Sequence, residues 1–107
     1  MPWIESQEAA QAAVNKLRQQ IETAVLDDES NKTTFEMFEL LGCLSPIKSL
    51  FGVSYFWQVQ TGNNACVQLR IVQVNEDRSE ELGILAIKVA SLQDKFEYLD
   101  PRDGYVQ

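Results

Sequence analysis

The sequence contains no histidine among its 107 residues. Serine and cysteine nucleophiles usually take their general base from an imidazole, so neither arrangement can be assembled within this chain. The common zinc and non-haem iron sites also depend on imidazole ligands. We therefore expect a non-catalytic protein, not an enzyme, with no catalytic residues, no metal site and no cofactor.

Cysteine and glycine are scarce, and neither forms a functional motif. The two cysteines, Cys43 and Cys66, lack the C-x-x-C spacing of zinc and redox sites. We expect two reduced, buried thiols, with a single disulfide between them as the alternative. The five glycines match neither a G-x-G-x-x-G nor a Walker pattern, so no nucleotide site is indicated.

Positive charge is also in short supply. The chain has 9 Lys and Arg against 16 Asp and Glu, a net charge of −7 and a pI near 4.4. The bases are scattered singly, whereas proteins that bind a phosphate backbone cluster them, so we expect neither nucleic acid nor a membrane as a partner. The acidity is typical of a soluble surface. The alternatives are a surface for a basic protein and a mimic of nucleic acid.

Long apolar runs are missing as well. No stretch approaches the roughly 18 to 20 apolar residues of a membrane helix, and residues 1–8 lack the basic start and apolar run of a secretory signal. We therefore expect a cytoplasmic protein. Its length suits a single domain over residues 1–107, and its 45% of hydrophobic residues is enough for a folded core.

The start of the chain predicts a helix over residues 6–26. Ser6 can cap its first turn, whereas polar residues such as Gln11, Arg18 and Glu22 are expected to face away from the apolar side. That side can pack on the chain's own sheet or on a second copy of the helix. It is a stripe with helical spacing, made of Ala10, Val14, Leu17, Ile21, Ala24 and Val25.

A second helix is predicted over residues 33–41. Thr33 to Glu36 resembles a capping box, apolar residues follow, and Gly42 stands where a C-terminal cap belongs. Residues 27–32 are interpreted as a solvated linker, and Pro46 would suit the first position of one further helical turn.

From Gly52 onward the apolar period changes to two, which predicts strands. A β-hairpin is expected around a turn at residues 61–64, and a third strand is expected at residues 84–90, after a charged loop. In that third strand the residues expected to point inward are Leu85, Ile87 and Val89.

Residues 91–99 fit two interpretations. Asp94 could cap a short C-terminal helix, or the segment could form a fourth, edge strand, and residues 100–104 would end either one. The predicted fold class is α+β: two N-terminal helices packed on an antiparallel sheet of three or four strands.

The predicted hairpin is poor in charge, because residues 50–74 contain a single charged side chain, Arg70. A hairpin with one face in water usually carries more charge on that face, whereas interfaces are depleted in charge and enriched in aromatics. We expect this face to be covered, either by another protein chain or by the chain's own C-terminal segment. The residues expected at a partner interface are Phe56, Trp57, Gln58, Gln60, Gln68 and Arg70.

Three functions compete. The leading hypothesis is a protein-interaction module (an adaptor, assembly chaperone, inhibitor or small subunit) that binds a protein partner, or a second copy as a homodimer, through the hairpin face. The alternative is a domain that encloses a pocket for a small apolar ligand or, more rarely, an active site. Phe35, Phe38 and Tyr55 would line that pocket, with the ring N–H of Trp57 as a polar group. The third is an acidic nucleic-acid mimic that acts as an inhibitor.

Overall fold

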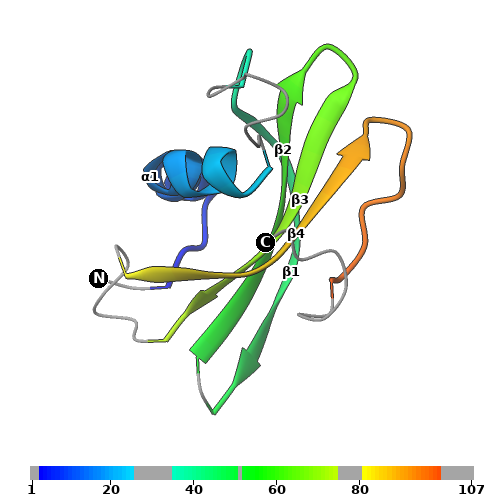
Figure 1. Ribbon diagram of the computed structural model, residues 1–107. Coiled ribbons are helices and arrows are strands. Elements are labelled where there is room, and N and C mark those ends of the chain that lie inside the picture. The colour runs from blue at the N-terminus through cyan, green and yellow to red at the C-terminus, as the bar shows by residue number, and fades with distance from the viewer. Residues whose placement is uncertain (1–2, 26–34, 51, 75–80, 100–107) are drawn as a thin grey trace.

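One helix and four strands make up the part of the chain that the computed structural model describes, residues 3–25, 35–50, 52–74 and 81–99. The four strands form one antiparallel sheet in the order β1-β2-β3-β4, and α1 lies across one of its faces (Figure 1). The expected α+β class is confirmed. Within the described ranges, no helix is both long and apolar enough to span a membrane. The elements are α1 (Gln7–Val25), β1 (Glu39–Ser49), β2 (Gly52–Gly62), β3 (Ala65–Gln73) and β4 (Leu82–Ser91).

Helix α1 forms as predicted and packs on the chain's own sheet. The Ser6 hydroxyl accepts a hydrogen bond from the Ala9 N–H at 3.1 Å, as an N-cap does. Four residues of the predicted stripe are buried against the strands, since their spacing places them on one side of the helix; they are Ala10, Val14, Leu17 and Ile21.

The prediction of a second helix is wrong for the residues that the structure describes. Residues 35–38 have no regular structure, and residues 39–49 form β1, which pairs with β2. Pro46 lies in this edge strand at a register shift between Leu44 and Ile47 rather than in a helical turn, a position that tolerates a missing N–H. The predicted linker 27–32 and Thr33 lie outside the described residues.

Polar side chains of α1 explain why residues 35–40 are extended. Glu22 accepts a hydrogen bond from the Phe35 N–H at 2.7 Å, and Arg18 donates one to the Phe35 carbonyl at 3.0 Å. Gln11 accepts one from the Leu40 N–H at 2.6 Å. These side chains were expected to face away from the core, yet they bind the backbone of residues 35–40 and so pair its polar groups in the extended form.

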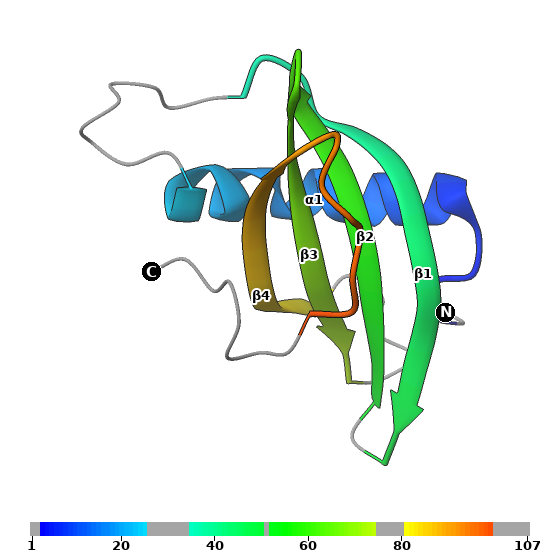
Figure 2. The same ribbon diagram turned by 90° about the vertical axis from the view of Figure 1, so that its right-hand side faces the viewer.

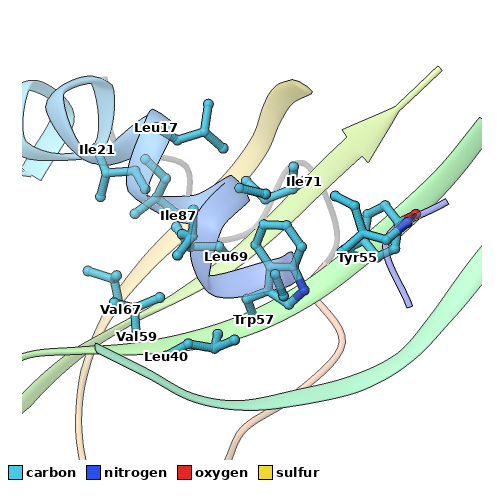
Figure 3. Close-up of a cluster of buried hydrophobic side chains, with 14 of the residues drawn as sticks. Leu17, Ile21, Leu40, Tyr55, Trp57, Val59, Val67, Leu69, Ile71 and Ile87 are labelled. Carbon is cyan, nitrogen blue, oxygen red and sulfur yellow. Dashed lines mark hydrogen bonds between the residues drawn. The ribbon is translucent and has the colours of Figure 1, made fainter. Parts of the chain in front are cut away.

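The predicted hairpin is confirmed as β2 and β3, which pair with Trp57 opposite Leu69 and Val59 opposite Val67. The alternation of faces along β2 is also as predicted, with Tyr55 and Trp57 in the core on the α1 side and Phe56 on the other side. Figure 3 shows the resulting cluster between helix and sheet.

Strand β4 is longer than predicted, and its inward residues differ. A register shift between Arg70 and Ile71 leaves Leu85 without a partner on β3, which is a β-bulge. Because the bulge reverses the alternation, Ile84 and Ile87 pack on the core instead of Leu85 and Ile87. Val89 pairs with the core residue Val67 and so lies on the predicted side of the sheet, but it is 56% exposed at the end of this edge strand.

The C-terminal segment, defined here as residues 92–99, is neither a helix nor a strand. It begins with a turn in which the Asp94 carboxylate accepts a hydrogen bond from the Ser91 N–H at 3.0 Å. The rest runs back over the sheet face opposite α1 (Figures 1 and 2). The sheet is therefore covered on both faces. Residues 100–104, predicted to end this element, lie outside the described residues.

Candidate functional site

The hairpin face that was expected to meet a partner is covered by the C-terminal segment. Phe56 and Gln68 have no exposed surface, and the Tyr98 ring lies edge-on to Phe56 with 4.7 Å between centroids. The Gln68 amide donates to the Lys95 carbonyl at 2.9 Å and accepts from the Glu97 N–H at 3.5 Å. Gln68 thus pairs with the segment's backbone much as a neighbouring strand would.

Arg70, the single charge of the hairpin, also holds this segment. It donates to the Leu99 carbonyl at 2.9 Å and to the Ser54 hydroxyl at 3.4 Å. Its guanidinium carbon lies 5.3 Å from the centre of the Phe56 ring, within the range of a cation–π contact. The low charge of the hairpin is therefore explained within the described chain by intramolecular packing.

The other residues proposed for a partner interface do not form one surface. Trp57 lies on the α1 side and is 1% exposed. On the opposite face, Gln58 donates to the Cys66 sulfur at 3.6 Å, and Gln60 donates to the Gly62 carbonyl at 2.9 Å. The six residues are divided between two faces of the sheet.

The cysteines are free thiols on opposite faces. Cys66 is buried, as expected, whereas Cys43 is exposed, so the prediction of two buried thiols is wrong for Cys43. Cys43 pairs with Trp57 and shares the α1 side of the sheet, because strand β1 places it at an edge that α1 does not cover completely. Partial burial raises the pKa of the Cys43 thiol above its ordinary value.

A half-open hollow of about 520 Å³ lies between the start of the chain and the strands β1 and β2. One wall is the N-terminal segment, defined here as residues 3–6, together with the first turn of α1. The other wall is the α1 side of residues 43–48 and 53–57. Its lining is mainly apolar and aromatic, with few polar groups: Trp3, Ile4, Glu5, Ser6, Gln7, Ala10, Cys43, Leu44, Pro46, Lys48, Val53, Tyr55 and Trp57.

Tyr55 holds the two walls of the hollow together. Its hydroxyl accepts a hydrogen bond from the Ile4 N–H at 2.9 Å and donates one to the Gln73 side-chain oxygen at 2.9 Å. Its ring stacks on Trp57 with 5.5 Å between centroids, and Figure 3 shows the two side chains together. Burial raises the pKa of Tyr55; the Ile4 hydrogen bond opposes this, and the Glu5 carboxylate adds to it.

The hollow contains one basic and one acidic side chain, Lys48 and Glu5. Among the described residues Arg18 pairs with Glu22 on α1, whereas Lys48 forms no ion pair with a carboxylate. No three acidic or thiol side chains of the described residues come together as a metal site would require. The hollow is therefore an aromatic cavity with an unpaired ammonium group.

Sequence reasoning identified part of this lining. Tyr55 and Trp57 were expected in a pocket and line the hollow. Phe35 and Phe38 were also expected there, but they stack on each other, 5.8 Å apart, beside Arg18. The lining residues of β1, including Lys48, were not predicted, because residues 33–41 were interpreted as a helix and Pro46 as the start of one further helical turn. No protein-family model and no curated protein matches this sequence.

Proposed function

We propose that this domain binds a small apolar ligand in the hollow between the N-terminal segment and strands β1 and β2. The observation that carries the proposal is the set of three aromatic side chains, Trp3, Tyr55 and Trp57, around a half-open space of about 520 Å³. Ligand pockets have volumes of about 300–1,000 Å³ and combine such walls with a few polar groups.

The hollow is held open before any ligand enters. Tyr55 ties the N-terminal segment to β2 and β3 through two hydrogen bonds, and Ala10 anchors the first turn of α1 in the core. A preformed site loses little conformational entropy when a ligand binds. More of the free energy gained by burying apolar surface therefore contributes to affinity.

Two further observations support binding in the hollow over the other functions considered. The hairpin face is filled by the chain's own residues around Phe56 and Gln68, which leaves little of that face for a partner. Cys43, the thiol in the hollow, has a raised pKa and is mostly un-ionised at neutral pH, which suits a binding role better than nucleophilic catalysis. The protein partner, the second copy, the nucleic-acid mimic and the cytoplasmic location remain predictions.

The test is a variant that fills the hollow without touching the core. Cys43 is an exposed residue of β1 that lines the hollow, so Cys43→Phe should obstruct it while α1 and the sheet stay packed. The probe is N-phenyl-1-naphthylamine, a neutral apolar compound whose fluorescence rises on burial. We expect the wild-type protein to bind this probe and Cys43→Phe to bind it at least about tenfold more weakly.

Leu41→Phe is the matched control, because Leu41 is an exposed residue of the same strand that does not line the hollow. It should bind the probe like the wild-type protein. Equal affinity for the probe in Cys43→Phe and in the wild-type protein would contradict the proposal.

A further inference from the structure

The indole N–H of Trp57 forms no hydrogen bond with a described residue, and its nitrogen is not fully buried. The side chain is 1% exposed and lines the hollow, and its ring stacks on Tyr55. Figure 3 shows the ring nitrogen on the side of the ring nearer Tyr55. A ligand that offers an oxygen at this point can therefore accept a hydrogen bond for which the described chain has no competing acceptor.

Two further features make the hollow attractive to a negative group. Lys48 lies opposite Val53, on the α1 side, and lines the hollow without a carboxylate partner. The start of α1 also borders the hollow, through its capping residue Ser6 and its first residue Gln7, and the start of a helix carries a partial positive charge. These groups belong to two walls that face the same space.

Glu5 is the one group of the hollow that acts in the opposite direction. It is exposed on the N-terminal segment, and its charge contributes to the raised pKa of Tyr55. The negative charge of Glu5 therefore disfavours an anion near Glu5 and Tyr55. The position that remains favourable is on the β1 wall, beside Lys48.

We propose that the ligand is an amphipathic acid, with an aromatic or aliphatic body and one anionic group. The body lies against Trp3 and Tyr55, the anionic group meets the Lys48 ammonium, and an oxygen of the ligand accepts the Trp57 N–H. This inference rests on the proposed function and adds the chemical class of the ligand.

Two probes with the same body but different charge test this directly. The anionic probe is 8-anilinonaphthalene-1-sulfonate, and N-phenyl-1-naphthylamine is the same skeleton without the sulfonate. Each is titrated into the full chain and followed by fluorescence. We expect the sulfonate to bind about tenfold more tightly than the neutral probe at low salt, and added salt to reduce that preference, because screening weakens a charge contact.

Substitution of Lys48 assigns the preference to this residue. Lys48→Gln should remove the preference for the sulfonate, so that the two probes bind with similar affinity. Lys88→Gln, on β4 outside the hollow, changes the net charge equally and should keep the preference. The fold of each variant is checked by circular dichroism, and its affinity for the neutral probe is then measured as well.

The outcomes separate the two proposals. Equal affinity of the wild-type protein for both probes, or an unchanged preference in Lys48→Gln, overturns the acidic ligand while the hollow remains a binding site for apolar compounds. If neither probe binds, or if Cys43→Phe binds both like the wild-type protein, the hollow itself is not the site and both proposals fail.

Discussion

At the residue scale, the Tyr55 hydroxyl joins parts of the chain that are 51 residues apart, since it accepts the Ile4 N–H in a buried position. Tyr55→Phe removes this acceptor and the hydrogen bond to Gln73. We expect a loss of about 1–3 kcal/mol in the free energy of unfolding, because the Ile4 N–H is left unpaired. The measurement is urea denaturation, and affinity for the neutral probe should fall as well. Stability equal to the wild type would show that this tie is not needed.

Tyr55 also has a specific dependence on pH. Burial raises its pKa in the folded state, above the ordinary value of about 10. The folded state therefore holds its proton more tightly than the unfolded state, so this contribution to stability is complete below about pH 10 and is lost as pH rises through the raised value. Wild-type stability should fall more steeply than that of Tyr55→Phe above about pH 10. Parallel curves of unfolding free energy against pH for the two proteins would contradict the raised pKa of Tyr55.

Cys43 provides a chemical readout of the hollow. In the native protein a thiol reagent should modify Cys43 and spare Cys66, which is buried; in denaturant it should modify both. Because the pKa of Cys43 is raised, the rate at which the reagent modifies it should keep rising with pH beyond the pH at which the reaction rate of an unperturbed thiol becomes constant. The probes should slow the reaction. Rapid modification of native Cys66, identified by peptide mapping, would contradict the structure.

At the element scale, α1 holds the start of β1 through side chains. Glu22 accepts the Phe35 N–H and pairs with Arg18, whose nitrogen lies 3.1 Å from the carboxylate. Glu22→Ala should lower the free energy of unfolding by about 1–3 kcal/mol, because a buried N–H loses its acceptor. Gln20→Ala, at an exposed position of the same helix, should change it by less than about 0.5 kcal/mol. Equal effects in the two variants would contradict this role for Glu22.

At the scale of the whole molecule, the sheet lies between two layers, α1 on one face and the C-terminal segment on the other (Figure 2). Phe56 is fully buried under the second layer, whereas Tyr98, which covers it, is 52% exposed. Phe56→Glu should cost about 4 kcal/mol or more, because it buries a charge and removes core volume. Tyr98→Ala should cost about 1 kcal/mol. Thermal unfolding distinguishes them, and a fully stable Phe56→Glu would show that the segment does not cover this face.

Several features followed from local patterns. The cap at Ser6, the apolar stripe of α1 and the alternation of β2 and β3 were predicted correctly because each depends on neighbours a few residues away. The covered state of the charge-poor hairpin face was also predicted, although a partner and the chain's own C-terminal segment fitted the pattern equally well. Two members of the hollow, Tyr55 and Trp57, came from the same alternation.

Tertiary contacts decided the rest. The apolar residues between Phe35 and Ile47 suit a helix or a strand as sequence. Hydrogen bonds that Glu22 and Gln11 of α1 accept from the Phe35 and Leu40 N–H groups, together with pairing to β2, selected the extended form. The hollow needs Trp3, Lys48 and Tyr55 to come from three separate segments. The sequence by itself therefore determined which residues share a face of an element. Long-range packing decided which of these faces contact one another and where the hollow lies between them, and no local sequence pattern contains that information.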